Sequence, residues 1–278
     1  MSEVTAQGLS GVSETLLVTL YLRAMESQRP DALIKDEKAV ALVKQISDDG
    51  RYDFSRIRLL HLSEANKLVI ILRSRELDRY TSDFLGHHPE AVVVHIGCGF
   101  DSRFERVDNG QVEWYDLDLP DIIALRRKLI GDEGERYHLL GCSVLDNAWL
   151  EAVSAHSQRP FLFLAEGVFM HLEERQVKSL MLMLREHFLG AELVFDAYSP
   201  LHNWVSNFQS ARFGFRTRWG IWRGQEIERW GDGIRLLDEW GFFDRPEPRL
   251  AHLRWLRPLE AAIRTLRVYH YRLGEAAA

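Results

Sequence analysis

The chain alternates between short apolar runs and longer amphipathic segments over most of its 278 residues. The apolar runs are rich in β-branched and aromatic residues and have the length of buried strands. They cover residues 91–96, 112–115, 138–142, 161–167 and 192–198. The segments between them have helical spacing, as in Val177, Leu180, Met181, Leu184 and Phe188. Strands that alternate with helices predict an α/β fold built on a parallel sheet.

The pattern at the two ends of the chain differs from this alternation. From Ser13 onward it predicts one helix, a turn at Pro30, a short second helix and a long helix over about residues 55–85. After residue 233 it predicts a helix in residues 236–243, a strand at 250–255 and a final strand or helix around 268–271. We therefore divide the chain into an N-terminal helical segment, residues 1–90, and a sheet domain, residues 91–278.

The alternation stops between residues 199 and 233. This stretch holds four of the eight tryptophans and five arginines, so it is too aromatic for a solvated linker. We interpret it as a lid over the strand ends, and helical packing against the core is the alternative. Arginines interleaved with aromatic residues also occur in single-stranded nucleic-acid sites.

The composition of the chain restricts which kinds of ligand and partner it is expected to bind. The net charge of −6, from 35 basic and 41 acidic residues, argues against sequence-independent binding to nucleic acid. The two cysteines, Cys98 and Cys142, form no pattern with zinc spacing, so we expect no metal site. No signal peptide and no apolar run of membrane-spanning length is visible, so we expect a cytoplasmic protein without membrane contact.

A glycine turn after the first strand is the main candidate for ligand binding. Gly97 and Gly99 would let the backbone approach a ligand, and Asp118 at the tip of the next strand would accept hydrogen bonds from ribose hydroxyls. A dinucleotide fingerprint would have a third glycine where Ser102 stands, and Asp101 is a poor neighbour for phosphate. These residues favour a nucleoside without phosphates, and S-adenosylmethionine fits. An isolated Gly-x-Gly is also common in plain turns.

Four segments resemble one family in order and spacing. They are VVHIGCGFDSRF, WYDLDLPDIIALRR, CSVLDNAW and FLAEGVFMHL. Together they are similar to the leucine carboxyl methyltransferases, and most of all to the tetracenomycin-type polyketide O-methyltransferase branch. The resemblance implies a Rossmann-like class I methyltransferase fold with N-terminal helices and a lid, S-adenosylmethionine as methyl donor, and a carboxylate as acceptor.

The resemblance also implies a cofactor site. Asp118 would hold the ribose, Glu166 the amino group or the sulfonium charge, and Arg73 or Arg75 the cofactor carboxylate. Ser143 and Val144 would hold the adenine, although better-known members have an acid where Ser143 stands. The implied site consists of Arg73, Arg75, Gly97, Cys98, Gly99, Asp101, Asp118, Leu119, Ser143, Val144, Glu166 and Gly167.

The acceptor remains the open question at this point. A small-molecule carboxylate, such as that of a polyketide intermediate, is already ionised at neutral pH and needs no base. An arginine would hold it, and the candidates are Arg23, Arg212, Arg216 and Arg218. A phenol or enol acceptor would need a base, for which His202, His171 and His95 are candidates. A third possibility is a cofactor-binding protein without catalysis. The sequence does not indicate the oligomeric state or the pathway.

Overall fold

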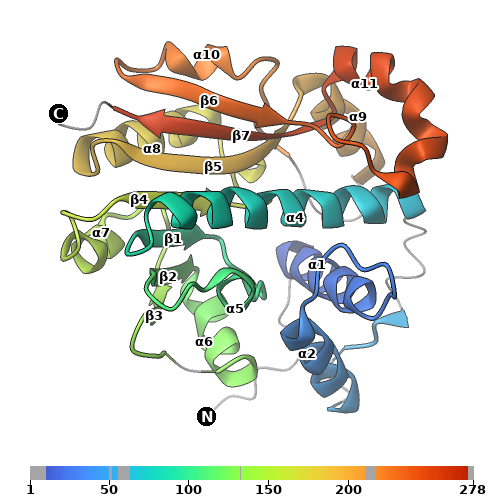
Figure 1. Ribbon diagram of the computed structural model, residues 1–278, viewed down its shortest axis with the longest axis horizontal. Helices are drawn as coiled ribbons and strands as arrows, with labels where there is room; N and C mark the ends of the chain where they lie inside the picture. The colour runs from blue at the N-terminus through green and yellow to red at the C-terminus, as the bar shows by residue number, and fades with distance from the viewer. Residues whose placement is uncertain (1–10, 50–51, 56–62, 132, 211–216, 275–278) are drawn as a thin grey trace.

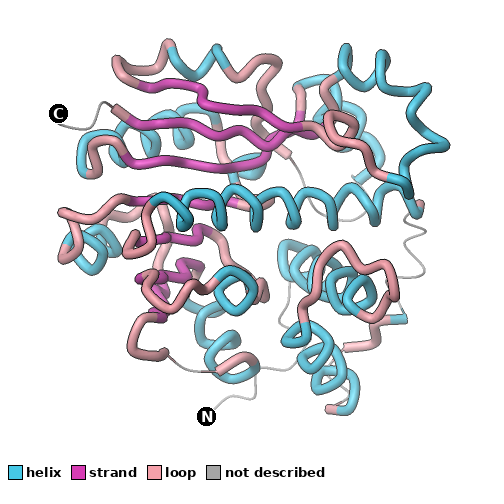
Figure 2. The backbone as a smooth tube through the Cα atoms, viewed as in Figure 1, coloured by secondary structure: helices cyan, strands magenta, loops and turns pink. Residues whose placement is uncertain are grey.

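The computed structural model describes residues 11–49, 52–55, 63–131, 133–210 and 217–274, which contain one mixed sheet with helices on both faces (Figures 1 and 2). The strand order of this sheet is β3–β2–β1–β4–β5–β7–β6. The strands are β1 (Val92–Ile96), β2 (Glu113–Asp118), β3 (Tyr137–Gly141), β4 (Phe161–Ala165), β5 (Ala191–Tyr198), β6 (Ile234–Trp240) and β7 (Leu266–Leu273). Strands β1 to β5 are parallel, whereas β7 is antiparallel to both of its neighbours. The predicted α/β fold is confirmed, and its parallel part ends at β5.

Local signals explain where several helices begin. The Asp36 and Ser63 side chains accept hydrogen bonds from backbone N–H groups in the first turns of α2 and α4, and Pro120 lies in the first turn of α6. The α-helices are α1 (Gly11–Ser27), α2 (Glu37–Asp48), α4 (Glu64–His87), α5 (Arg103–Val107), α6 (Pro120–Leu129), α7 (Ala148–Ser154), α8 (Glu174–His187), α9 (Pro200–Ser210), α10 (Gln225–Glu228) and α11 (Arg257–Ile263). The 3₁₀ helices in the described part of the chain are η2 (Phe169–His171) and η3 (Pro248–Leu256). None of the described helices combines the length and apolarity needed to cross a bilayer.

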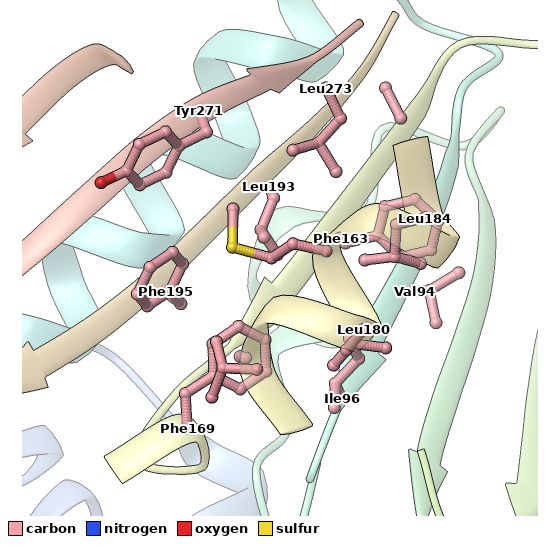
Figure 3. Close-up of a cluster of buried hydrophobic side chains, with 14 of the residues drawn as sticks. Val94, Ile96, Phe163, Phe169, Leu180, Leu184, Leu193, Phe195, Tyr271 and Leu273 are labelled. Carbon is pink, nitrogen blue, oxygen red and sulfur yellow. The ribbon is translucent and has the colours of Figure 1, made fainter. Parts of the chain in front are cut away.

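The two faces of the sheet carry alternate strand residues and bury them against different helices. On one face, Val94, Phe163 and Phe195 pack with Leu180 and Leu184 of α8 (Figure 3). On the other face, the neighbouring strand positions pack against α4, the long helix that runs across the sheet in Figure 1. Because both faces are covered, β4 is apolar throughout and β1 is apolar except for His95, which is why the sequence shows them as continuous or nearly continuous runs.

The N-terminal helices join the sheet at the glycine turn. Helix α1 packs on α2 and on α4, and its Leu17 and Leu20 share a buried cluster with Phe100, which directly follows the turn. The long helix expected over residues 55–85 is α4, and residues 56–62 lie outside the described part of the chain. The described helices of residues 1–90 are therefore packed against the sheet domain rather than separate from it.

Two expectations for the C-terminal part were wrong. Residues 236–243 do not form a helix, because residues 236–240 belong to β6 and pair with β7; the register of this pairing is irregular between Leu236 and Asp238. Residues 250–255 do not form a strand but belong to η3, which has Pro248 in its first turn and a capping bond from the Arg249 N–H to the Glu247 side chain. The segment around residues 268–271, left open between strand and helix, is β7.

The segment from residue 199 to 233 divides into two parts. Helix α9 begins directly after β5 and lies with α11 at the end of the sheet where β5 ends and β7 begins (Figure 1). It exposes Leu201, Trp204 and Val205. Farther along, Trp219 and Ile227 are buried in the main core, so this part of the segment is core packing. Residues 211–216, between the two parts, lie outside the described residues.

We expect Leu72→Ala in α4 to lower the free energy of unfolding by about 2–5 kcal/mol, because its side chain is fully buried between α4 and the sheet. Leu259→Ala in α11, where the side chain is 55% exposed, should change it by less than about 0.5 kcal/mol. Urea unfolding of both variants measures the difference. Equal losses would contradict the assignment of α4 as the helix that covers this face.

Candidate active site

The glycine turn at the end of β1 is held from two sides. The Gly99 N–H donates to Asp118 Oδ2 at 2.8 Å, and the Gly99 carbonyl accepts from Arg126 Nη1 at 2.9 Å. Both Gly97 and Gly99 have positive φ, at 66° and 48°, which disfavours any other residue. A Cβ on Gly97 would lie 2.3 Å from a methyl group of Val168, which follows β4. The turn is therefore fixed in position, and its glycines permit a close approach of neighbouring groups.

The carboxylate of Asp118 stands at the tip of β2, next to this turn. Its two oxygens each accept one backbone N–H, from Gly99 and from Leu119, and the residue is half-buried. Burial raises the pKa of Asp118, and the two backbone hydrogen bonds oppose that rise only in part. Each carboxylate oxygen can accept more than one hydrogen bond, so Asp118 retains capacity for ligand hydroxyls.

Ser143 and Val144 follow β3, the neighbour of β2. The Cys142 N–H donates to the Asp118 carbonyl at 3.0 Å, which places this turn beside Asp118. Ser143 accepts the Leu145 N–H on its side-chain oxygen and the Asp146 N–H on its carbonyl. Two leucines next to these strand ends, Leu119 and Leu145, are 53% and 40% exposed. This edge of the sheet therefore offers both polar groups and apolar surface to a ligand.

At the ends of β4 and β5, Arg73 joins two acids. Its Nε donates to Glu166 Oε1 at 3.0 Å, and its Nη1 donates to Asp196 Oδ2 at 3.0 Å. Asp196 also accepts the Gly167 N–H. The end of the guanidinium faces Gly167, since Nη1 and Nη2 lie 3.6 and 3.7 Å from where a Cβ of that glycine would be. An arginine has five N–H donors, so these contacts leave donors for a further acceptor.

The Glu166 carboxylate is buried, and each of its oxygens is paired with an arginine: Oε1 with Arg73 and Oε2 with Arg103. Ser74 donates to Oε1 at 2.6 Å, and Arg103 Nη2 donates to Oε2 at 2.6 Å. Burial alone would raise the pKa of Glu166, but Arg73 and Arg103 outweigh it and lower the pKa to about 2. Asp196 is different: burial raises its pKa, and Arg73 compensates only in part.

Arg75 lies elsewhere, although it is only two residues from Arg73. Two residues turn an α-helix by about 200°, so the two side chains leave α4 in nearly opposite directions. Arg75 Nη1 pairs with Glu247 Oε2 at 3.2 Å, in the segment that leads into η3. Of the two arginines expected to bind the cofactor carboxylate, the structure brings only Arg73 to the strand ends.

Three other candidates are enclosed in the protein. Asp101 is 7% exposed, and its carboxylate contacts Arg106 at 2.9 Å and Arg103 at 3.2 Å. Arg23, a candidate for binding the acceptor, is 3% exposed and donates to Asp36 and to the Phe100 carbonyl. Cys98 is also buried, and burial raises the pKa of its thiol well above the usual range. These three side chains surround the site from within the protein, and none of them presents an exposed surface to a ligand.

His202 and Tyr198 form a stacked pair at the end of β5. Their rings are 4.5 Å apart and inclined by 24°. Burial lowers the pKa of His202, so its imidazole is neutral near pH 7. Neither the His202 ring nor the Tyr198 hydroxyl has a hydrogen-bond partner among the described residues. Sequence reasoning named His202 and missed Tyr198, which reads there only as part of a strand.

The remaining arginine candidates differ in accessibility. Arg218 is exposed, with 57% of its side chain accessible, and its backbone N–H donates to the Met170 carbonyl at 2.7 Å. This bond places it near the turn that follows Glu166. Arg212 and Arg216 lie outside the described residues. Sequence reasoning also missed Arg103 and Ser74, whose positions facing Glu166 depend on how α5 and α4 pack.

Comparison with known proteins gives three findings. A profile of the leucine carboxyl methyltransferases matches residues 16–184. The tetracenomycin polyketide synthesis O-methyltransferase TcmP of Streptomyces glaucescens is 36% identical over 248 residues, covering 86% of each chain. The S-adenosyl-L-methionine-dependent methyltransferase dpfgK of Gibberella zeae is 31% identical over 264 residues, covering 89% of this chain and 88% of its own.

Solved structures show the same fold at low identity. A DUF574 family protein from Streptomyces avermitilis has a TM-score of 0.57 at 12% identity, covering 91% of this chain and 96% of its own. A protein described as a methyltransferase from Thermobifida fusca has a TM-score of 0.55 at 13% identity, covering 75% of this chain and 82% of its own. At such identities the likeness concerns the fold and not the chemistry.

Proposed function

Because the chain belongs to the leucine carboxyl methyltransferase family, it is an S-adenosylmethionine-dependent methyltransferase, and we propose that it esterifies a carboxylate of a small molecule. The family match over residues 16–184 carries this proposal, because it includes the glycine turn, Asp118 and Glu166. TcmP is named for polyketide synthesis, which supports a polyketide or a similar natural-product intermediate as the acceptor.

The groups at the strand ends fit this cofactor. The glycine turn would pass beside the methionine part, and the half-buried Asp118 would accept the ribose hydroxyls. Ser143 and Val144 would lie along the adenine. Glu166 would face the ammonium group, and the free donors of Arg73 would pair with the cofactor carboxylate. When bound, S-adenosylmethionine supplies a methyl group on a sulfonium that an acceptor oxygen takes by in-line displacement.

A carboxylate acceptor requires little of the protein beyond alignment. Its pKa is about 4, so it is an anion at neutral pH and no residue has to remove a proton. Catalysis then comes from holding the oxygen in line and excluding water. Arg218 is our candidate for holding the acceptor carboxylate, because it is the accessible member of the described arginine candidates. The exposed apolar residues of α9, Leu201, Trp204 and Val205, would cover the acceptor body as the lid.

One observation favours a phenol or enol acceptor as the second candidate. The neutral imidazole of His202 stands just beyond the end of β5, the strand that carries Asp196, and makes no hydrogen bond to the described residues. A phenol has a pKa near 10 and must lose its proton during transfer, and an imidazole in this state can accept it. Tyr198, stacked on His202, would then present an aromatic surface to the acceptor.

We expect Asp118→Ala to weaken S-adenosylhomocysteine binding by about 1.5–3 kcal/mol, because charge-assisted hydrogen bonds to the ribose are lost. Asp121→Ala is the matched control: it removes an exposed acid in the first turn of α6, three residues away. Isothermal titration calorimetry measures both. Unchanged affinity in Asp118→Ala would remove the ribose assignment.

Arg73→Lys should weaken S-adenosylhomocysteine binding by at least about tenfold, because a lysine cannot reproduce the fork that joins Glu166, Asp196 and a ligand carboxylate. Arg75→Lys should bind like the parent, because Arg75 faces Glu247. The two variants are measured side by side by calorimetry. The reverse order of affinities would show that the wrong arginine was assigned.

The two acceptor classes are separated by a matched pair of probes, naphthoic acid and naphthol, supplied with labelled methyl donor. We expect methylation of the acid, a product that base hydrolyses, and a rate that is flat from about pH 6 to 8, above the pKa of a carboxylate. With His202 as base, the rate would be constant while the imidazole is neutral and would fall as the pH drops through its lowered pKa, below about 6.5.

His202→Gln distinguishes the same alternatives without relying on the probe. It removes the base and should leave esterification of the acid close to the parental rate. A base-stable methyl ether, together with a large loss of rate in His202→Gln, would overturn the carboxylate proposal and support the phenol acceptor.

A further inference from the structure

Arg103, in the short helix after the glycine turn, is completely buried and contacts four segments at once. Its Nε donates to Asp78 of α4 at 2.6 Å, its Nη1 lies 3.2 Å from Asp101 of the turn, and its Nη2 donates to Glu166 at 2.6 Å. Its Nη1 also lies 3.3 Å from His95 Nε2 of β1. The side chain is 0% exposed. A buried arginine is costly unless its donors are matched to acceptors, and here each nitrogen of the guanidinium has its own acid.

We propose that Arg103 is a positioning residue for the cofactor: it holds the Glu166 carboxylate in place and ties it to the glycine turn and to α4. This inference rests on the proposed place of Glu166 in the cofactor site. Arg103 itself would touch neither the cofactor nor the acceptor, since Glu166 and Asp101 stand around it. Its effect on binding would pass through Glu166.

The groups around Glu166 show what Arg103 contributes. Helix α4 supplies Arg73 and Ser74, the segment after β1 supplies Asp101 and Arg103, and β5 supplies Asp196. Asp101 acts against ionisation of Glu166, so the two arginines maintain its charge against burial and against that neighbour. Without Arg103, only one cation would remain in contact with the carboxylate.

Arg106 offers a matched control in the same helix. It is also buried, with 7% of its side chain exposed, and it pairs with Asp36, Asp78 and Asp101. Within the described residues Arg106 makes no ion pair with Glu166, although it shares Asp78 and Asp101 with Arg103. Removing Arg106 therefore damages the same network and leaves both arginine contacts of Glu166 in place.

The experiment measures S-adenosylhomocysteine affinity between pH 8 and pH 5 in Arg103→Met, Arg106→Met and the parent. Loss of Arg103 should raise the pKa of Glu166 from about 2 toward the assay range, so Glu166 becomes protonated as the pH falls and loses its hold on the ligand ammonium. The affinity ratio of parent to Arg103→Met should grow at low pH, by about tenfold for each unit by which the new pKa exceeds the assay pH. The ratio for Arg106→Met should stay constant.

Two further variants complete the test. In a Glu166→Gln background, Arg103→Met should add no pH dependence, because the titrating group is gone. If Arg103→Met does not fold, Arg103→Gln keeps hydrogen-bond donors without the charge and makes the same measurement. A pH-independent ratio in a folded Arg103 variant would overturn the inference. If Glu166→Gln alone binds like the parent at every pH, the proposed cofactor contact of Glu166 is wrong, which is a different failure.

Discussion

The structure depends on the pairing of buried charges at the carboxyl ends of the parallel strands. Glu166 can be buried as an anion only because Arg73 and Arg103 contact its two oxygens from different helices. If either arginine were displaced, a charge would remain in a poorly solvated place, at a cost of several kcal/mol. The positions of α4 and α5 relative to β4 are therefore coupled to one carboxylate. The same coupling places the glycine turn, because Arg103 also contacts Asp101.

The pairing extends beyond Glu166 into one connected network that reaches the N-terminal helices. Within the described residues its arginine–carboxylate pairs join Arg23, Arg73, Arg103 and Arg106 with Asp36, Asp78, Asp101, Glu166 and Asp196. His95 lies between Asp101 and the separate pair of Asp116 with Arg126. Four arginines face five carboxylates, which leaves one negative charge unmatched when all are ionised. S-adenosylmethionine carries one net positive charge, so the network has the sign that attracts it.

The three acids at the strand ends differ in the direction of their pKa shift. Asp118 and Asp196 have raised pKa values, because burial is only partly offset by their hydrogen bonds and, for Asp196, by Arg73. Glu166, which is paired with two arginines, has a lowered pKa. Asp196 is fully buried, whereas Asp118 is half-buried and each of its oxygens can accept a further hydrogen bond. The strand ends thus combine a firmly charged carboxylate with one that has hydrogen-bonding capacity left.

The sequence by itself determined the alternation of strands and helices, the glycine turn, the acid at the tip of β2 and the family. These features are local: a buried strand is a continuous apolar run, and a positive φ demands glycine wherever the chain later packs. The wrong predictions concern segments whose conformation depends on contacts with distant parts of the chain. Residues 236–240 of the segment expected as a helix instead belong to β6, because they pair with β7. Nothing local distinguishes Arg73 from Arg75 either. Only the packing of α4 on the sheet turns Arg73 toward Glu166 and Arg75 toward Glu247, and brings Arg103 from another helix to the same carboxylate.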